Sequence, residues 1–282
     1  MTRAPLVERR HALPLSGTPE SGATCDSVPF VLPFLEERMS TLVVRRILIV
    51  SATLALAACA GSSQPSVQPS VPASVLLSDA DRAAGWRSLF DGKSLSDWRG
   101  YKSSQVPTGW TIVDGTIVKP AGAEDLVSRE QFANFELSLD WKLTDSGNAG
   151  IFYRATEEYE HIYWSGPEYQ LLDDARAPDG RNRLTSAASA YGLYAPPAGV
   201  VHDAGQWNTT RILVRGSHVE HWLNWQKVVE YEFGSADWTA KVKASKFGAW
   251  PNYGRSTAGY IGIQGDHNGM LSLRNLKIRV FP

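Results

Sequence analysis

Apolar and polar residues alternate along much of the chain after residue 85, which is the pattern of β-strands with one buried face. The clearest case is residues 135–143, where every odd position is apolar. Hairpins are predicted around Asp114-Gly115 and Gly216-Ser217, because each dipeptide separates two strand-like runs. Further strands are expected over residues 150–154, 228–232, 259–264 and 271–280, the last with a β-bulge at Arg274-Asn275, where its apolar parity changes.

Helical periodicity is weak in the same region. A short helix is expected within residues 78–86, with Ser78 or Asp79 as its N-cap, and a helical turn at residues 236–238. No internal repeat stands out. Many short strands separated by turns predict an all-β fold, a two-sheet antiparallel jelly-roll sandwich with minor short helices.

One stretch, residues 166–174 (Gly-Pro-Glu-Tyr-Gln-Leu-Leu-Asp-Asp), does not follow the alternation. Its even positions hold Glu168, Gln170 and a leucine, and its odd positions hold an aromatic, a leucine and Asp173, so each face of a strand would carry an acid. A buried carboxylate is costly unless it is paired or protonated, which favours a polar cleft. The alternative is a strand end running into a solvated loop, with Asp173-Asp174 as its turn.

The N-terminal residues have the layout of a secretory signal. Residues 39–58 begin with a basic segment, continue with a short apolar run and end in small residues before Cys59. This resembles a bacterial lipobox, and the resemblance implies cleavage before Cys59 and lipid attachment to its sulfur. An ordinary signal peptide with an incidental cysteine is the alternative.

The organisation that follows has four parts. Residues 1–38 are expected to be a leader from a mis-assigned start, residues 39–58 a signal peptide, residues 59–77 a lipid anchor with a flexible Ser/Pro linker, and residues 78–282 one domain. The lipid would hold the protein at a membrane in the cell envelope. Because Ala60 is not acidic, we expect the outer membrane, facing the periplasm or the cell surface.

Composition narrows the chemistry. The only cysteines, Cys25 and Cys59, precede the domain, so it has no disulfide framework and no thiolate chemistry. The net charge of −1 provides no basic stripe and argues against nucleic acid as a partner. All 10 tryptophans follow residue 85, which suits an aromatic core and also stacking against sugars.

Six motifs in order strongly resemble the 3-keto-disaccharide hydrolase domain family. They are residues 89–95 with Trp98, then residues 145–154, 166–174, 205–208, 219–224 and 274–279. The resemblance runs from about Trp86 to Val280. It implies a concanavalin-like jelly roll, which agrees with the strand pattern, and cleavage of a carbohydrate already oxidised at C3.

The resemblance also suggests roles. A C3 ketone acidifies the C2 proton, so elimination of the C1 oxygen needs a base, an acid and a group that stabilises the enolate. Glu168 is the first choice for a catalytic carboxylate and Asp173 the second. Arg154 could stabilise the enolate or form a structural ion pair with Glu168 or Asp173. Gln170 could orient the sugar or donate to the ketone.

Other side chains are candidates for contact with substrate or metal. The candidates for substrate are Tyr153, Tyr169, Tyr194, His221 and His267. For His221 a half-buried sheet position is the favoured alternative, and for His267 an exposed turn is equally open. A divalent metal (Ca, Mg, Mn or Zn) could bind Asp173, Asp174 and His267, although no spacing is diagnostic.

The sequence departs from the family at two places. Family members often carry a histidine shortly after the Leu-Asp-Asp step, where this chain has Ala177. They also tend to have glycine after the asparagine of the third hairpin, where Trp225 follows Asn224. We therefore expect a longer hairpin loop there and no type I′ turn. A non-catalytic carbohydrate-binding module is the alternative function, and an ordinary retaining glycosidase ranks last because no Glu-x-Asp-x-x-Glu strand is present.

Overall fold

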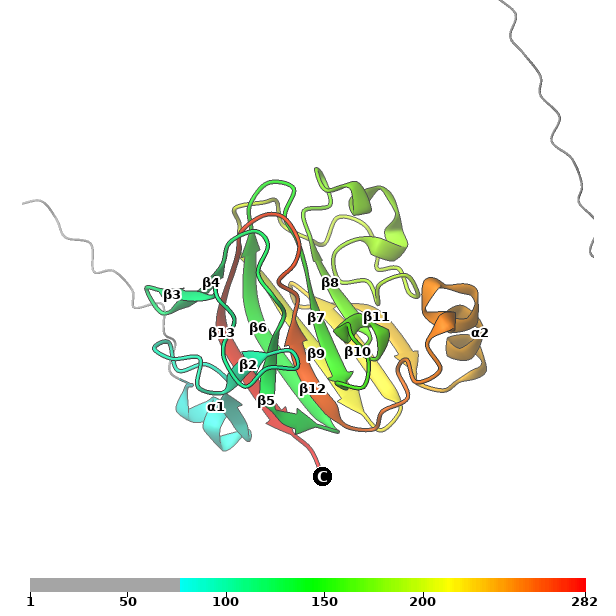
Figure 1. The fold of residues 1–282 in the computed structure, drawn as a ribbon, viewed down its shortest axis with the longest axis horizontal. Coiled ribbons are helices and arrows are strands. Elements are labelled where there is room, and N and C mark those ends of the chain that lie inside the picture. Colours follow the sequence, from blue (N-terminus) through cyan, green and yellow to red (C-terminus); the bar gives the residue numbers. More distant parts are fainter. Residues whose placement is uncertain (1–76) are drawn as a thin grey trace, which may run out of the picture. The chain divides into compact units, whose positions relative to one another are not determined.

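Two antiparallel sheets make up the domain in the computed structural model, which describes residues 77–282 (Figure 1). The eight-stranded sheet has the order β11-β10-β9-β6-β13-β4-β3, with β1 also paired to β13. Its strands are β1 (Trp86–Ser88), β3 (Thr111–Val113), β4 (Thr116–Lys119), β6 (Phe135–Leu143), β9 (Asn208–Arg215), β10 (His218–Leu223), β11 (Gln226–Glu232) and β13 (Leu271–Val280). The five-stranded sheet has the order β2-β5-β12-β7-β8. Its strands are β2 (Trp98–Gly100), β5 (Leu126–Phe132), β7 (Asn148–Ala155), β8 (Glu168–Leu172) and β12 (Gly259–Ile263).

Short helices complete the fold, and the all-β prediction is confirmed. They are α1 (Asp79–Ala83), α2 (Ala236–Ala244) and the 3₁₀ turns η1 (Ile162–Trp164), η2 (Pro178–Arg181), η3 (Arg183–Thr185) and η4 (Lys246–Ala249). Ser78 caps α1 as predicted, by accepting from the Asp81 N–H. Helix α2 is longer than the predicted single turn, and Ser235 caps it. Within residues 77–282, none of the helices has the length and apolar character needed to cross a membrane.

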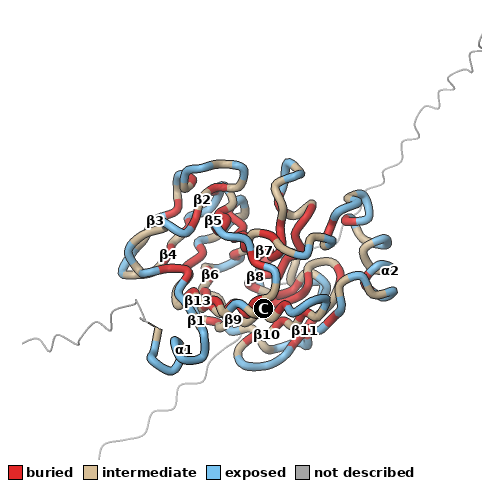
Figure 2. The backbone as a smooth tube through the Cα atoms, turned by 90° about the horizontal axis from the view of Figure 1, so that it is seen from below, coloured by how far each residue is buried: buried red, intermediate tan, exposed pale blue. Residues whose placement is uncertain are grey.

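The core lies between the two sheets (Figure 2). Every odd residue of β6 is buried, as the alternation predicts. A chain of hydrogen bonds crosses this core: Trp141 Nε1 donates to Thr210 Oγ1 at 2.9 Å, and the Thr210 hydroxyl donates to Tyr169 OH at 2.8 Å. Tyr169 OH in turn donates to the Trp222 carbonyl at 3.1 Å. These polar groups therefore satisfy one another inside the core.

Turn geometry confirms two predictions and corrects a third. Asp114 and Gly115 have φ of 48° and 71°, as a type I′ turn requires, and a bulge occurs in β13 between Arg274 and Lys277. The expectation of a longer loop at Asn224-Trp225 was wrong. Leu223 pairs with Gln226, and the two residues between them have φ of 47° and 70°. The strand register imposes a two-residue turn there, in spite of the tryptophan.

The predictions for residues 1–76 lie outside the described residues. They comprise the leader, the signal peptide, lipidation at Cys59 and nearly all of the linker.

Candidate functional site

Strand register brings Glu168 and Gln170 to the outer face of the five-stranded sheet. Tyr169 points into the core, so its neighbours on β8 point outward. In the adjacent strand β7, Phe152 is opposite Glu168 and Gly150 is opposite Gln170. Glu168 and Gln170 therefore form a polar patch on the outer face of this sheet, where both side chains are almost fully covered.

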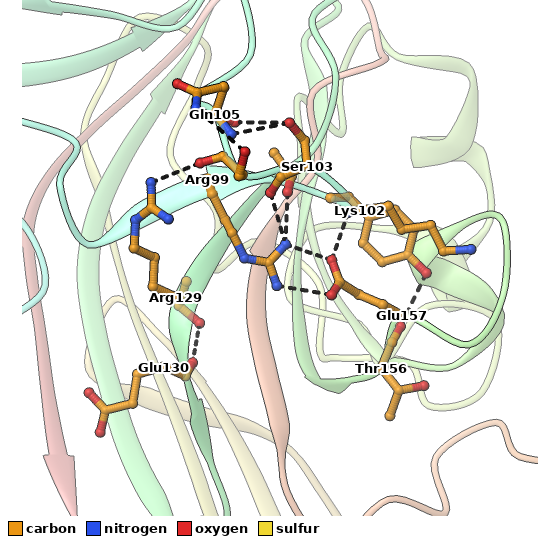
Figure 3. A network of polar contacts seen from close by, with 12 residues as sticks. Arg99, Lys102, Ser103, Gln105, Arg129, Glu130, Thr156 and Glu157 are labelled. Atoms are coloured by element: carbon orange, nitrogen blue, oxygen red, sulfur yellow. Dashed lines mark hydrogen bonds and ion pairs between the residues drawn. The ribbon is translucent and has the colours of Figure 1, made fainter.

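The outer face has an apolar half beside this patch. Val127, Phe152 and Ile162 are packed together there, and Ile162 belongs to the covering segment that contains η1. A polar network holds that segment on the sheet (Figure 3). In it, Arg99 of β2 makes a two-pronged ion pair with Glu157, with N–O distances of 2.6 and 3.0 Å. The segment that contains η1 is thus held over the apolar half of the outer face, and the polar patch lies next to it.

Gly150 provides the space that the Glu168 carboxyl group occupies. A Cβ at residue 150 would lie 2.1 Å from Glu168 Oε1. The Gln170 amide, oriented as its neighbours require, donates to Glu168 Oε1 at 3.0 Å and to the Ala149 carbonyl at 3.1 Å. Gly150 was missed from the sequence, although a glycine inside a strand is a known sign of close approach.

The Glu168 carboxyl group is buried and has no paired cation among residues 77–282. Burial raises the pKa of Glu168 to about 8, and the more distant Lys246 opposes this rise. Asp125, Asp266 and Asp179 raise the pKa further by repulsion. Glu168 therefore holds a proton at neutral pH, which is the state of a general acid.

A loop after β12 borders the same patch. The Gln264 N–H donates to the Gly150 carbonyl at 2.9 Å, and Gln264 Oε1 is a buried acceptor without a partner among the described residues. The buried Lys119 donates from Nζ to the carbonyls of Gly265 and His267, at 3.2 and 2.9 Å. Lys119 thus fixes the loop that carries His267, whose side chain is 43% exposed and whose Nδ1 lies 3.8 Å from Asp266 Oδ1.

A second boundary of the patch comes from residues after β8. The Tyr191 N–H donates to the Glu168 carbonyl at 3.0 Å, and its hydroxyl donates to Asp179 at 3.2 Å. Lys246 Nζ lies 4.5 Å from the Tyr191 ring centroid. The patch therefore combines an aromatic ring, amide groups and one protonated acid, a set that suits a sugar.

Three residues predicted to contact substrate lie elsewhere. Tyr153, Tyr169 and His221 have no exposed surface and point into the core between the sheets, so the prediction of direct contact was wrong for them. His221 Nδ1 donates to the Ala188 carbonyl at 3.0 Å, so its Nε2 accepts from Tyr153 OH at 2.8 Å. Burial lowers the pKa of His221 to about 4, and the ring stays neutral. The alternative interpretation, a sheet histidine in the core, describes it better.

The second catalytic candidate, Asp173, has a local structural role. It lies after β8, where its carboxylate accepts from the backbone N–H groups of Ser146 and Ala175, at 2.8 and 3.3 Å. Asp174 accepts from the Ala187 N–H at 2.7 Å, and burial raises its pKa. Both carboxylates therefore help to shape the backbone after β8, and a metal at Asp173, Asp174 and His267 stays a prediction. The buried Ala177 offers no titratable group in their neighbourhood.

Arg154 and Tyr194 also lie away from Glu168. Arg154 has φ of 48° and donates from Nε and Nη2 to the Ala133 carbonyl, at 2.9 and 2.7 Å. It forms no ion pair with Glu168 or Asp173, and it lines a separate cavity of about 740 Å³. A direct role of Arg154 beside Glu168 was wrong. Tyr194 donates to Asp237 at 2.7 Å and stacks on Tyr231, with 4.9 Å between ring centroids.

The fold together with the relatives of this chain defines a class, a β-sandwich hydrolase that cleaves glycosides. A profile of the 3-keto-alpha-glucoside-1,2-lyase-like domain matches residues 85–279, and the chain belongs to this family. A curated 3-keto-disaccharide hydrolase of Bacteroides thetaiotaomicron is 35% identical over 234 residues, which span 72% of this chain and 79% of the relative.

Solved structures agree with this membership. A candidate glycosyl hydrolase from Parabacteroides distasonis is 32% identical, with a TM-score of 0.69 over 73% of this chain and 99% of that chain. A second candidate glycosyl hydrolase from the same organism is 26% identical, with a TM-score of 0.59 over 70% of this chain and 99% of that one. The family resemblance read from the ordered motifs is confirmed.

Proposed function

We propose that the protein cleaves 3-keto-glycosides, including 3-keto-disaccharides, with Glu168 as the proton donor to the leaving oxygen. The observation that carries this proposal is the buried Glu168 carboxyl group, whose pKa burial raises to about 8. A general acid with this pKa is protonated at neutral pH and can still give up its proton. The activity named for the curated relative supports the choice of substrate.

The reaction balances as an elimination followed by addition of water. A base takes the C2 proton, which the C3 ketone acidifies, and the electron pair forms the enolate. The enolate collapses to a C1–C2 double bond and expels the C1 oxygen, which takes the Glu168 proton. Because Gln170 donates to Oε1, the proton of Glu168 belongs on Oε2 and is free to be transferred. Water then adds across the double bond, which completes a net hydrolysis.

The candidates for the base that takes the C2 proton lie around the loop after β12. Burial raises the pKa of Asp125 to about 6, a value suited to a base at neutral pH, and Asp125 accepts from the Gly265 N–H at 2.8 Å. His267, on the same loop, is the second choice. Single substitutions Asp125→Asn and His267→Gln distinguish the two.

The decisive experiment follows release of free sugar from a 3-keto-disaccharide, compared with the unoxidised disaccharide, with and without chelator. We expect cleavage of the keto substrate and loss of cleavage in Glu168→Gln. Retained activity in that variant would remove Glu168 from the mechanism. A loss on chelation that added Ca, Mg, Mn or Zn restores would establish a metal requirement.

We also propose that lipid on Cys59 holds the protein at the cell envelope, in the outer membrane. The support is the run of small residues before Cys59 together with the non-acidic Ala60. Labelling with a radioactive fatty acid should mark the wild-type chain and not Cys59→Ser. Equal labelling of both would show that the cysteine is not the site.

A further inference from the structure

We propose a second carbohydrate-binding site on the outer face of the eight-stranded sheet, centred on Trp225 and separate from the Glu168 patch. Its ligand would be a neutral pyranose chain. The site would hold a glycan without cleaving it. The proposal does not depend on the 3-keto substrate.

Trp225 is the most exposed of the large hydrophobic residues in the described part of the chain. Its exposure is 83%, and the next, Val113, has 52%. Burial in the core therefore does not explain why an indole is present. A large exposed aromatic ring is a common platform for apolar faces of ligands.

The backbone at Trp225 is unfavourable for tryptophan. With φ of 70° it occupies the left-handed region, the second central position of a type I′ turn, where glycine is unstrained. The chain thus retains a strained, exposed residue at a turn where glycine fits better. Residues kept under such strain without a packing gain cluster at functional positions.

A groove runs along the sheet from Trp225. Two connected hollows of about 270 and 240 Å³ share Ser138, Thr209 and Trp225. Thr210, next in sequence, points into the core, so Thr209 points outward. The hollows therefore lie on the opposite side of the sandwich from Glu168, and a single small ligand cannot occupy both sites.

Polar groups line the groove as a sugar would require. Asn275 donates to Asp140 Oδ2 at 2.6 Å, but Asn275 Oδ1 is buried without a partner among the described residues. A sugar hydroxyl would supply the missing donor. At the other end, Trp222 lies under the Arg211 guanidinium, 3.9 Å from the ring centroid, and its Nε1 donates to Glu220. Because the strong charges beside the groove are already paired, a neutral ligand suits it better than an ionic one.

The test measures binding of full-length protein to maltoheptaose, cellohexaose and laminarihexaose by calorimetry. We expect one of them to bind, and Trp225→Gly to weaken that binding about tenfold or more. Trp225→Phe should retain most of the affinity, because it keeps an aromatic platform. Trp225→Gly should unfold at an equal or higher temperature, since glycine relieves the strain, so lost affinity cannot be attributed to misfolding.

Several results would overturn the proposal. These are the absence of binding by all three oligosaccharides, equal affinity of the wild type and Trp225→Gly, or a change in sedimentation on Trp225→Gly that reveals an interface between protein chains. Cleavage of a small keto substrate is the separate readout. We expect it to be unchanged in Trp225→Gly, whereas failure of the proposed reaction would appear in the wild type itself.

Discussion

Acidic residues on the outer faces of the two sheets differ in whether they have cationic partners. On the eight-stranded sheet Glu136 contacts both Arg211, at 2.8 Å, and Arg279, and Glu220 is 3.3 Å from Lys227. On the five-stranded sheet Glu168 forms no ion pair within residues 77–282, and its nearest polar partner is the Gln170 amide. Glu136 is as buried as Glu168, with exposures of 3% and 5%, so the difference lies in the cationic partners and not in burial.

This difference separates structural acids from a functional one. The oxygens of Glu136 and Glu220 are already engaged by cationic side chains, so neither acid is available to donate a proton to a ligand. Glu168 is destabilising to the fold when ionised, and such a residue is best explained by a task that needs its proton. Substitution of an acid on one face at a time tests whether the two kinds of acid have different roles.

The largest expected effect is on catalysis. Glu168→Gln should lower cleavage of a 3-keto-disaccharide by a factor of about 10² to 10⁴, the range that a general acid supplies. Initial rates of sugar release measure this. Glu136→Gln is the matched control on the other face and should keep its rate. Equal losses in both variants would mean that the distinction between the faces is wrong.

The next effect is on the pH dependence of stability. The folded pKa of Glu168 is about 8 against an ordinary value of 4.5, so the folded state favours the protonated form. Ionisation of Glu168 should therefore cost stability as pH rises from about 4.5 to about 8, by up to about 5 kcal/mol. Urea unfolding across this range should show the fall in wild type and a flatter profile in Glu168→Gln. Parallel profiles would contradict the assignment.

A smaller effect is expected from filling the space at Gly150. Because an added Cβ would lie 2.1 Å from Glu168 Oε1, Gly150→Ala should displace the carboxyl group. We expect a loss of about 1–3 kcal/mol in unfolding free energy, together with a lower rate of cleavage. Gly150 does not have a positive φ, so the effect of Gly150→Ala reports the contact of the added Cβ with Glu168 and not backbone strain. A Gly150→Ala enzyme with normal rate would show that Glu168 tolerates displacement.

The smallest effect belongs to the paired face. Glu232 accepts from His218 Nδ1 at 2.6 Å, and this contact is the largest cause of the raised pKa of His218. The stabilisation from His218 should be present below its ordinary pKa of 6.5 and lost as pH rises through the higher folded value. Glu232→Gln should therefore cost about 0.2–1 kcal/mol at pH 5.5 and little at pH 9. A larger loss at pH 9 would reverse the assignment.

Local patterns predicted most of the fold. The alternation of residues 135–143 identified β6, and the parity change at Arg274 identified the bulge, because both signals depend on near neighbours in sequence. Trp225 was misjudged because the pairing of β10 with β11 determines the turn, and turn propensity alone does not reveal this.

The site was predicted less completely. The even parity of Glu168 and Gln170 placed them together correctly, whereas Tyr153 and His221 could not be assigned to the core without knowing which face of each strand is buried. Lys119 could not be connected to the loop at His267, because 148 residues separate them in sequence.

The contact between Lys119 and that loop has a consequence for where the protein can work. Its ammonium group gives the carbonyls of Gly265 and His267 the kind of positive charge that a dissolved cation would otherwise offer. The occupancy of a site by a dissolved ion depends on the composition of the medium, whereas a lysine is part of the chain and is always present. The loop therefore carries its own cationic hydrogen-bond donor, and its shape should depend little on the salt concentration around it.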